Sequence, residues 1–297
     1  MTTRRFAQVD VFTMRAGYGN PVAVVLDGDG LDGAAMQRFA AWTNLSETTF
    51  VLPPTQAGAD FRVRIFTPRQ ELPFAGHPTV GTTHAVLALR PELAARAQLA
   101  LECAAGVLPV RIEGDGARRR IFVRAPAARI DAPLPALVDE FAQALGATPL
   151  AEPAPRLVDN GPHWLVAAFA DAAAVRALQP DLAAVAALTT RHGAVGVCVF
   201  GREPEGGDAA LAVRAFCPAD GIPEDPVTGS ANAAIGAFLH ATGMLADIGP
   251  RYRASQGREV GRDGHVEVAV DAHTGAVEIG GQCVTCIRGE LDLGDSA

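Results

Sequence analysis

The chain has 297 residues, of which 49% are hydrophobic and 20% are charged, and its formal net charge is −8. Because this length exceeds one typical hydrophobic core, two domains are expected in a globular protein of ordinary composition. The acidic balance argues against nucleic acid as a partner, since proteins that bind polyanions usually carry net positive charge. No apolar run is long enough for a signal peptide or a membrane span, so we expect a cytoplasmic protein without a membrane partner.

In the first half of the chain, Asp32 can cap a helix that ends near Asn44 and has one apolar face, made by Met36, Phe39 and Ala40. Period-two alternation over Arg62–Phe66 and Val110–Glu113 predicts strands, because successive side chains then point to opposite faces of a sheet. Between these strands, Thr79–Leu89 is small or apolar almost all round, which predicts a helix buried on every side.

The second half begins with a predicted helix over Leu137–Leu145, which a glycine follows as a stop signal. Asp171 and Asp181 can each cap a short Ala-rich helix. Ser230–Leu239 is a second helix without a polar face, and Val266–Val270 alternates in the manner of a strand.

Gly-rich turns separate several of the alternating segments, which favours hairpins over βαβ units. Each buried helix has predicted strands before and after it in the sequence. We therefore expect an α+β fold in which each half of the chain forms a curved, mostly antiparallel sheet around a central helix.

The two buried helices stand in matching contexts, which indicates an internal duplication. Arg64–Pro68 matches Arg214–Pro218 at an offset of 150 residues, and Gly76–Thr82 matches Glu224–Ser230 at an offset of 148. We predict two similar domains, residues 1–127 and 128–297, with the final strand of the chain able to return to the first domain. A pseudo-two-fold axis between them would leave a cleft.

Each matched loop leads into the N-terminus of a buried helix, where free backbone N–H groups and the helix dipole favour an anion. Pro78 and Pro226 suit the first turn of a helix, where no N–H is needed. Small residues would let a ligand approach the backbone closely, namely Gly76, Gly81, Gly229 and Ser230. A substrate carboxylate is the expected guest. The simpler alternative is helix capping alone, by Thr79, Asp225, Thr228 and Ser230.

Two ionisable side chains are candidates for chemistry. His77 lies at the position that this alignment of the repeats assigns to Asp225, which favours a functional role over that of a solvated loop histidine. Glu47 is a carboxylate in otherwise uncharged, partly apolar company. If it is buried, desolvation raises its pKa toward the working pH, as a general acid/base requires. Composition alone favours the alternative, an exposed glutamate in a turn.

The five cysteines do not form a disulfide framework, because their number is odd and their spacing is wide. Cys283 and Cys286 have CxxC spacing, but a zinc ribbon would need a second pair. We interpret them as two cysteines of a strand.

Four segments together resemble the phenazine-biosynthesis isomerase-like (PhzF-like) family: Gly19–Pro21, Asn44–Phe50, Leu72–Gly81 and Glu224–Asn232. They run in the family's order, and the likeness extends over nearly the whole chain. The resemblance implies a diaminopimelate epimerase-like fold and a homodimer. It also implies an isomerase without cofactor or metal, like the trans-2,3-dihydro-3-hydroxyanthranilate isomerase of phenazine biosynthesis.

The resemblance also implies roles for individual residues. The catalytic residues would be Glu47, His77 and Asp225, and the substrate-binding residues would be Gly76, Gly229, Ser230 and Asn20. Glu47 would take a proton from one carbon of a conjugated system and return it at another. The expected function is thus a cofactor-independent proton transfer on a small carboxylate substrate, which can be cyclic.

Two other functions compete with this one. One is an amino-acid racemase or epimerase of the same fold, and the resemblance among such enzymes implies a pair of cysteine bases at the two loops. Here the loops at 76–82 and 224–230 contain no cysteine, and Cys217 lies upstream of its loop. A non-catalytic relative would instead use the cleft or surface to bind a ligand or a protein.

Overall fold

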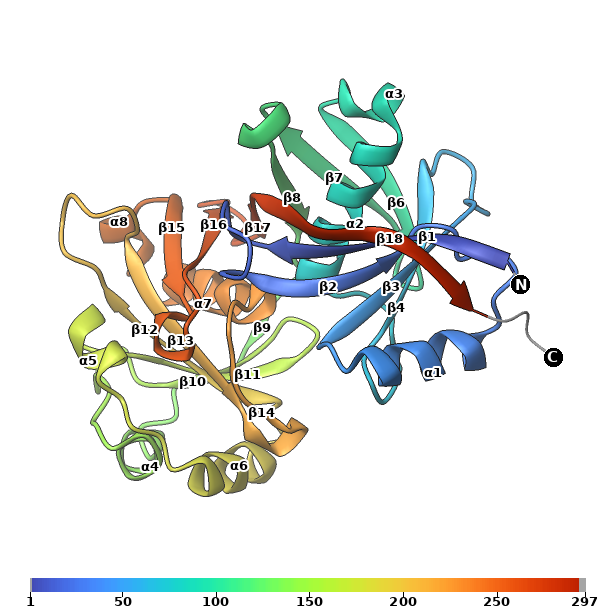
Figure 1. The fold of residues 1–297 in the computed structure, drawn as a ribbon. Coiled ribbons are helices and arrows are strands. Elements are labelled where there is room, and N and C mark those ends of the chain that lie inside the picture. Colours follow the sequence, from blue (N-terminus) through green and yellow to red (C-terminus); the bar gives the residue numbers. More distant parts are fainter. Residues whose placement is uncertain (1, 294–297) are drawn as a thin grey trace. The chain divides into compact units, whose positions relative to one another are not determined.

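The computed structural model describes residues 2–293, which divide into two compact units. Unit 1 runs up to Arg124 and includes the C-terminal segment from Gly280, whereas unit 2 comprises Ala125–Ile279. The predicted division lies between residues 127 and 128. In Figure 1 the red strand β18 lies beside the blue strand β1, and this pairing places the first and last strands in the same unit.

Unit 1 combines a sheet with a central helix. Its strands are β1 (Thr2–Val11), β2 (Asn20–Val25), β3 (Glu47–Leu52), β4 (Phe61–Phe66), β5 (Glu71–Leu72), β6 (Gln98–Cys103), β7 (Gly106–Glu113), β8 (Arg120–Arg124) and β18 (Cys283–Leu293). Its helices are α1 (Gly33–Thr43), α2 (Gly76–Leu89), α3 (Pro91–Ala94) and the 3-10 turn η1 (Gly116–Arg118).

The strands of unit 1 pair in the order β18–β1–β2–β3–β4–β6–β7–β8, and the short β5 pairs with the end of β4. Most pairs are antiparallel, as predicted, but β2–β3 and β4–β6 are parallel. Because α1 connects β2 to β3, the unit contains a βαβ element where the sequence pattern favoured hairpins.

α2 is the central helix of unit 1, as predicted, and it contacts β1, β2, β3, β8 and β18. Gly81 lets this helix lie close to the sheet, because an added Cβ would come within 2.5 Å of Val22 Cγ1 and 2.7 Å of Val11 Cγ2. The predicted role of Gly81, admitting a ligand to the backbone, is therefore wrong. The absence of its side chain serves helix–sheet packing instead.

Unit 2 repeats this architecture. Its strands are β9 (Arg129–Ile130), β10 (Arg156–Asp159), β11 (His163–Ala168), β12 (Gly196–Arg202), β13 (Leu211–Cys217), β14 (Ile222–Asp225), β15 (Arg251–Gln256), β16 (Gly264–Val270) and β17 (Val277–Gly281, which reaches the unit boundary). Its helices are α4 (Leu137–Leu145), α5 (Ala172–Arg176), α6 (Leu182–Arg191), α7 (Gly229–Thr242) and α8 (Leu245–Ile248), with 3-10 turns η2 (Pro218–Asp220) and η3 (Arg258–Val260).

The strands of unit 2 pair in the order β9–β10–β11–β12–β13–β15–β16, with β14 beside the end of β13. The pairs β11–β12 and β13–β15 are parallel, in the places that β2–β3 and β4–β6 occupy in unit 1. α7, orange in Figure 1, is the central helix and contacts β10, β11, β12 and β16. The two units thus share one topology.

The structure corrects the alignment of the two repeats. α2 begins at Gly76 and α7 at Gly229, so these helices correspond at an offset of 153 residues, not the predicted 148. The repeat partner of His77 is therefore Ser230 and not Asp225. Asp225 corresponds to Leu72, because the two residues pair with equivalent positions of β13 and β4.

Helices α1, α4, α5 and α6 begin where the sequence predicts, and α1 and α4 also end there. The Asp32 carboxylate accepts a hydrogen bond from the Ala35 N–H at the start of α1, and Asn44 ends that helix in the left-handed region at φ 54°. α4 ends at Gly146, and the carboxylates of Asp171 and Asp181 cap α5 and α6. Among residues 2–293, no helix is both long and apolar enough to cross a bilayer.

Candidate active site

One predicted site residue of unit 1, Glu47, directly follows the short connection between α1 and β3. Asn44 turns the chain sharply after α1, and Glu47 follows as the first residue of β3. The strand is tied to the central helix by a buried hydrogen bond of 2.7 Å between the hydroxyls of Thr49 and Thr82. Glu47 is therefore presented by a strand whose register against α2 is fixed.

Glu47 lies against the first turn of α2. Its Oε2 atom is 3.3 Å from Nε2 of His77, and the two side chains are only 15% and 8% exposed. Burial raises the pKa of the Glu47 carboxyl to about 7, and a hydrogen bond from the Ser46 side chain opposes that rise. The alternative of an exposed turn glutamate is wrong. A carboxyl that titrates near neutral pH can both accept and return a proton.

Asn20 lies beside this pair through the same short connection. It is the buried first residue of β2, and its Oδ1 accepts a hydrogen bond of 3.5 Å from the Ser46 hydroxyl. The loop before it is held by Asp10, whose Oδ2 accepts from the N–H groups of Gly17 and Gly19 at 2.7 and 3.1 Å. The structure therefore brings Asn20, Glu47 and His77 together in unit 1.

The residues predicted in unit 2 lie where β14 leads into α7. Asp225 is the last residue of β14, and its Oδ2 accepts a hydrogen bond of 2.6 Å from the Thr228 hydroxyl. Thr228 is the N-cap residue of α7, but its side chain bonds Asp225 and makes no capping bond to the helix. The capping interpretation is thus wrong for Thr228. It also fails for Asp225, which ends a strand.

Ser230 is in the first turn of α7. Its hydroxyl accepts a hydrogen bond from Trp164 Nε1 at 3.3 Å, and its backbone carbonyl accepts one from Asn160 Nδ2 at 2.9 Å. Unit 2 has no carboxyl group at the position equivalent to Glu47, and the Trp164 side chain lies beside that position. The equivalent residue is Gly196, and an added Cβ there would lie 2.6 Å from Trp164 Cζ3. The duplicated framework therefore carries a carboxyl group beside an imidazole in one unit and hydroxyl and carboxylate groups in the other.

The two prolines of the matched loops do not play the same role. Pro78 is the third residue of α2, as expected for a first turn. Pro226 lies before the N-cap of α7 and is outside the helix, so its predicted place in a first helical turn is wrong.

Sequence reasoning missed four polar residues around the predicted ones. These residues are Asp10, Trp164, Asn232 and Gln256. Asn232 and Gln256 are completely buried, and both bond to the loop that carries Asp225. The only sequence signal for Gln256 is that an apolar alternation in β15 ends on a polar residue before Gly257, whose φ is +97°.

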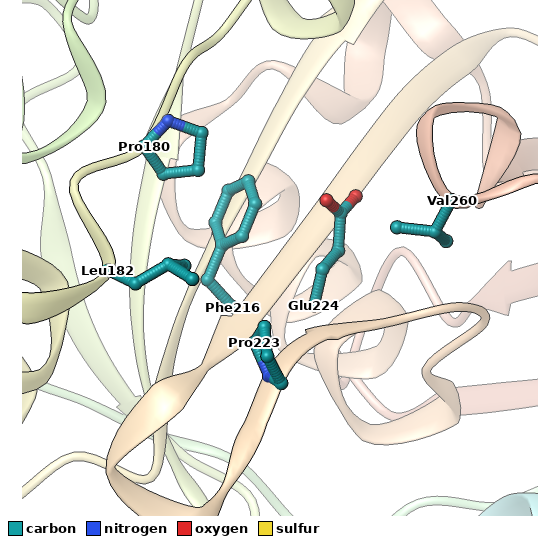
Figure 2. Close-up of a pocket in the computed structure, with 6 residues that line it drawn as sticks. All are labelled: Pro180, Leu182, Phe216, Pro223, Glu224 and Val260. Carbon is teal, nitrogen blue, oxygen red and sulfur yellow. The ribbon is translucent and has the colours of Figure 1, made fainter.

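A separate hollow of about 400 Å³ lies in unit 2, lined by Pro180, Leu182, Phe216, Pro223, Glu224 and Val260. Figure 2 shows the Phe216 ring and the Glu224 side chain next to each other, between Leu182 and Val260. The lining of this hollow includes none of the predicted site residues, although Glu224 directly precedes Asp225 in the sequence. Over residues 2–293, no group of three or more His, Cys, Asp or Glu side chains could hold a metal ion.

The cysteines lie on strands, and burial governs the pKa of the one near a predicted site residue. Cys283 and Cys286 are unpaired residues of β18, which confirms their assignment to a strand. Cys217 ends β13, and burial raises the pKa of its thiol well above the ordinary value, with a further contribution from nearby Asp225. A thiol in that environment stays protonated and is a poor base near neutral pH.

Comparison with known proteins identifies the family. Residues 9–289 match the family described as phenazine biosynthesis-like protein, and the chain belongs to it. A Schizosaccharomyces pombe protein named antisense-enhancing sequence 1 is 37% identical, over 98% of this chain and 99% of its own. A Pseudomonas chlororaphis protein named trans-2,3-dihydro-3-hydroxyanthranilate isomerase is 35% identical, over 96% of this chain and 98% of its own.

Solved structures agree with this assignment. A Bacillus anthracis phenazine biosynthesis protein of the PhzF family superimposes with a TM-score of 0.83 at 28% identity, covering 98% of this chain and 99% of that one. A hydroxyproline epimerase from Agrobacterium vitis has a TM-score of 0.65 at 16% identity, covering 98% of this chain and 91% of that one, which shows likeness of fold. The chain is thus a PhzF-like isomerase of diaminopimelate epimerase-like fold that acts on a small molecule.

Proposed function

We propose that this isomerase moves a proton between two carbons of a small, unsaturated carboxylate, with Glu47 as the acid/base and without a cofactor. One observation carries the proposal: the buried Glu47 carboxyl has a pKa raised to about 7 and lies 3.3 Å from His77 Nε2. A carboxylate with this pKa takes a proton from a weakly acidic carbon more readily than an ordinary surface glutamate, and it can return that proton without a second base.

The other predicted residues would act on the charge that this transfer creates. Loss of a proton from carbon leaves negative charge on the conjugated system, and His77 beside Glu47 can polarise the group that receives it. We propose that Asp225 acts with His77 in catalysis and that Ser230, Gly229, Gly76 and Asn20 bind substrate, as the family resemblance implies. Gly76 and Gly229 are the first residues of α2 and α7, so their N–H groups have no partner within the helix and suit a carboxylate.

A direct test uses the compound in the name of the Pseudomonas chlororaphis relative. The purified protein is incubated with trans-2,3-dihydro-3-hydroxyanthranilate in D₂O, and the reaction is followed by NMR. We expect isomerisation, with the shifted hydrogen partly replaced by deuterium because Glu47 exchanges with solvent. If neither conversion nor exchange occurs with this or related dihydroaromatic carboxylates, the proposed reaction is wrong.

Cofactor independence needs its own control. Activity is compared before and after extensive dialysis against a metal chelator and after denaturation and refolding without additives. Equal specific activity supports the proposal, and recovery only on addition of a metal or organic cofactor contradicts it.

A two-cysteine epimerase mechanism is the second candidate, and the raised pKa of Cys217 argues against it. Treatment with iodoacetamide should leave turnover unchanged, whereas loss of turnover in step with alkylation of Cys217 would favour the epimerase.

We also propose that the 30.8 kDa chain forms a homodimer, as the family resemblance implies. Light scattering coupled to gel filtration should give twice the mass of the chain, and a monomer at assay concentration would contradict this part of the proposal.

A further inference from the structure

The loop that carries Asp225 is held by a buried side-chain amide. Gln256, at the end of β15, is completely buried and makes four hydrogen bonds to that loop and to α7. Its Oε1 accepts from the Thr228 N–H at 3.0 Å and from Asn232 Nδ2 at 2.9 Å. Its Nε2 donates to the Asp225 carbonyl at 3.0 Å and to the Thr228 hydroxyl at 2.9 Å.

The backbone decides which way this amide points. The Thr228 N–H can only donate and the Asp225 carbonyl can only accept, so the oxygen of the amide must face the first and its nitrogen the second. The second hydrogen on Nε2 then points at the Thr228 oxygen. Because the hydroxyl accepts that hydrogen, its own single hydrogen is directed to Asp225 Oδ2, 2.6 Å away. The donor direction therefore runs from Gln256 through Thr228 to Asp225.

The fold alone does not require this chain of polar groups. The positions of Asp225, Thr228 and Gln256 correspond in unit 1 to Leu72, Ala75 and Cys103, as the N-caps of α2 and α7 and the strand registers show. Unit 1 forms the same strand, loop and central helix without a carboxylate, a hydroxyl or an amide at those places.

Burying polar groups such as Thr228 and Gln256 is unfavourable unless each is bonded, so their presence in one unit beside the partly buried Asp225 needs a reason specific to that unit. Among these three groups, the Asp225 carboxylate differs most from its counterpart, Leu72. We infer that Gln256 is a positioning residue, which acts through Thr228 to hold the Asp225 carboxylate in one orientation with Oδ2 as a hydrogen-bond acceptor. This inference rests on the proposed function in so far as Asp225 acts on the substrate.

The simplest test removes the Thr228 hydroxyl and keeps the shape of the side chain. Thr228→Val removes the donor to Asp225, and Thr228→Ser restores it. With trans-2,3-dihydro-3-hydroxyanthranilate as the probe, we expect kcat of Thr228→Val to fall by about 10- to 100-fold while KM changes little. Thr228→Ser should stay within about threefold of the unaltered protein. A serine variant as impaired as the valine variant would show that restoring the hydroxyl does not restore turnover, and it would overturn the inference.

Gln256→Glu tests the donor direction of the hydrogen bonds from Gln256 through Thr228 to Asp225. The new carboxylate can no longer donate to the Thr228 hydroxyl, which then turns its hydrogen away from Asp225. We expect a loss similar to that of Thr228→Val, and a double variant no worse than either single one, because both changes interrupt the same path. Multiplicative losses in the double variant would contradict a shared path.

Crystal structures of the two Thr228 variants give a readout that does not depend on turnover. The Asp225 carboxylate should turn from its present orientation in Thr228→Val and keep it in Thr228→Ser. An unmoved carboxylate in the valine variant would refute the inference. If the unaltered protein fails to act on the probe but these structures behave as expected, the proposed function fails and the positioning role stands.

Discussion

At the scale of single residues, the proposed proton transfer depends on where the Glu47 carboxyl lies. Glu47 would be an ordinary surface acid in a flexible turn, but α2 lies over it and removes its water. Desolvation is the larger influence on its pKa, and the Ser46 side chain opposes it. Local sequence could not predict this burial, because the residues that cover Glu47 come from about thirty positions later in the chain. Its candidacy came from the family resemblance.

The raised pKa of Glu47 predicts a stability effect with a definite sign. Its folded-state pKa of about 7 exceeds the ordinary value of 4.5, so ionising it costs folding free energy at high pH and nothing below about pH 4.5. Glu47→Gln should therefore leave stability unchanged at pH 4. It should raise it by on the order of 3 kcal/mol above pH 7.5.

Urea unfolding at several pH values measures this difference. Glu71→Gln is a matched control of opposite sign, because Arg64 lowers the pKa of Glu71 and the neutral residue loses that ion pair. A Glu47→Gln variant less stable than the unaltered protein at pH 8 would show that the carboxyl is not held in a desolvated state.

At the scale of elements, each unit has an equivalent Arg–Glu ion pair before its central helix. Arg64 on β4 makes a two-pronged ion pair with Glu71 on β5, with N–O distances of 2.7 Å, and Arg214 on β13 does so with Glu224 on β14 at 2.9 and 2.8 Å. Each guanidinium lies near the ring of the phenylalanine two residues on, 5.1 and 4.9 Å from its centre. These two ion pairs, called forks below, hold the short strands β5 and β14, which lead toward His77 and Asp225.

The sequence predicted most of these elements but misaligned the loops. Capping aspartates, apolar faces and stop residues define α1, α4, α5 and α6 locally, so their bounds follow from nearby residues. The His-Pro and Asp-Pro pairs look alike, yet a proline is tolerated both inside a first helical turn and in the extended chain before it. Similarity alone could not reveal that α2 starts before its proline and α7 after it.

The two forks differ in exposure, which predicts unequal effects. Arg214 and Glu224 have side chains 7% and 8% exposed, whereas those of Arg64 and Glu71 are 24% and 36% exposed. Arg214→Met leaves a buried carboxylate without its partner and should destabilise unit 2 by about 3–5 kcal/mol. Arg64→Met is the control and should cost about 1 kcal/mol or less. Thermal unfolding of both variants compares them, and equal losses would mean that burial does not set the strength of the fork.

At the scale of the whole molecule, a duplicated topology carries different chemistry in its two copies. Glu47 and His77 in unit 1 correspond to Gly196 and Ser230 in unit 2, and Asp225 corresponds to Leu72. The duplication and the central helices could be predicted from the order of motifs. The polar partner Gln256 could not, because it lies on β15, which meets the Asp225 loop only after folding.

The return of β18 to unit 1 predicts how a truncated chain behaves. β18 pairs with β1 along nearly its full length, so removing residues after Gln282 exposes the edge of β1 and one side of α2. Hydrogen exchange of β1 and α2 amides should speed up at least about tenfold, while α7 and β13 keep their protection. Uniform loss of protection in both units would contradict independent cores.

The turnover of Glu47→Gln tests the account most directly. Glutamine keeps the shape of the side chain and cannot carry the proton. With trans-2,3-dihydro-3-hydroxyanthranilate as substrate, kcat should fall by at least about 10³-fold while calorimetry shows nearly unchanged binding. Turnover within tenfold of the unaltered protein would show that Glu47 does not move the proton.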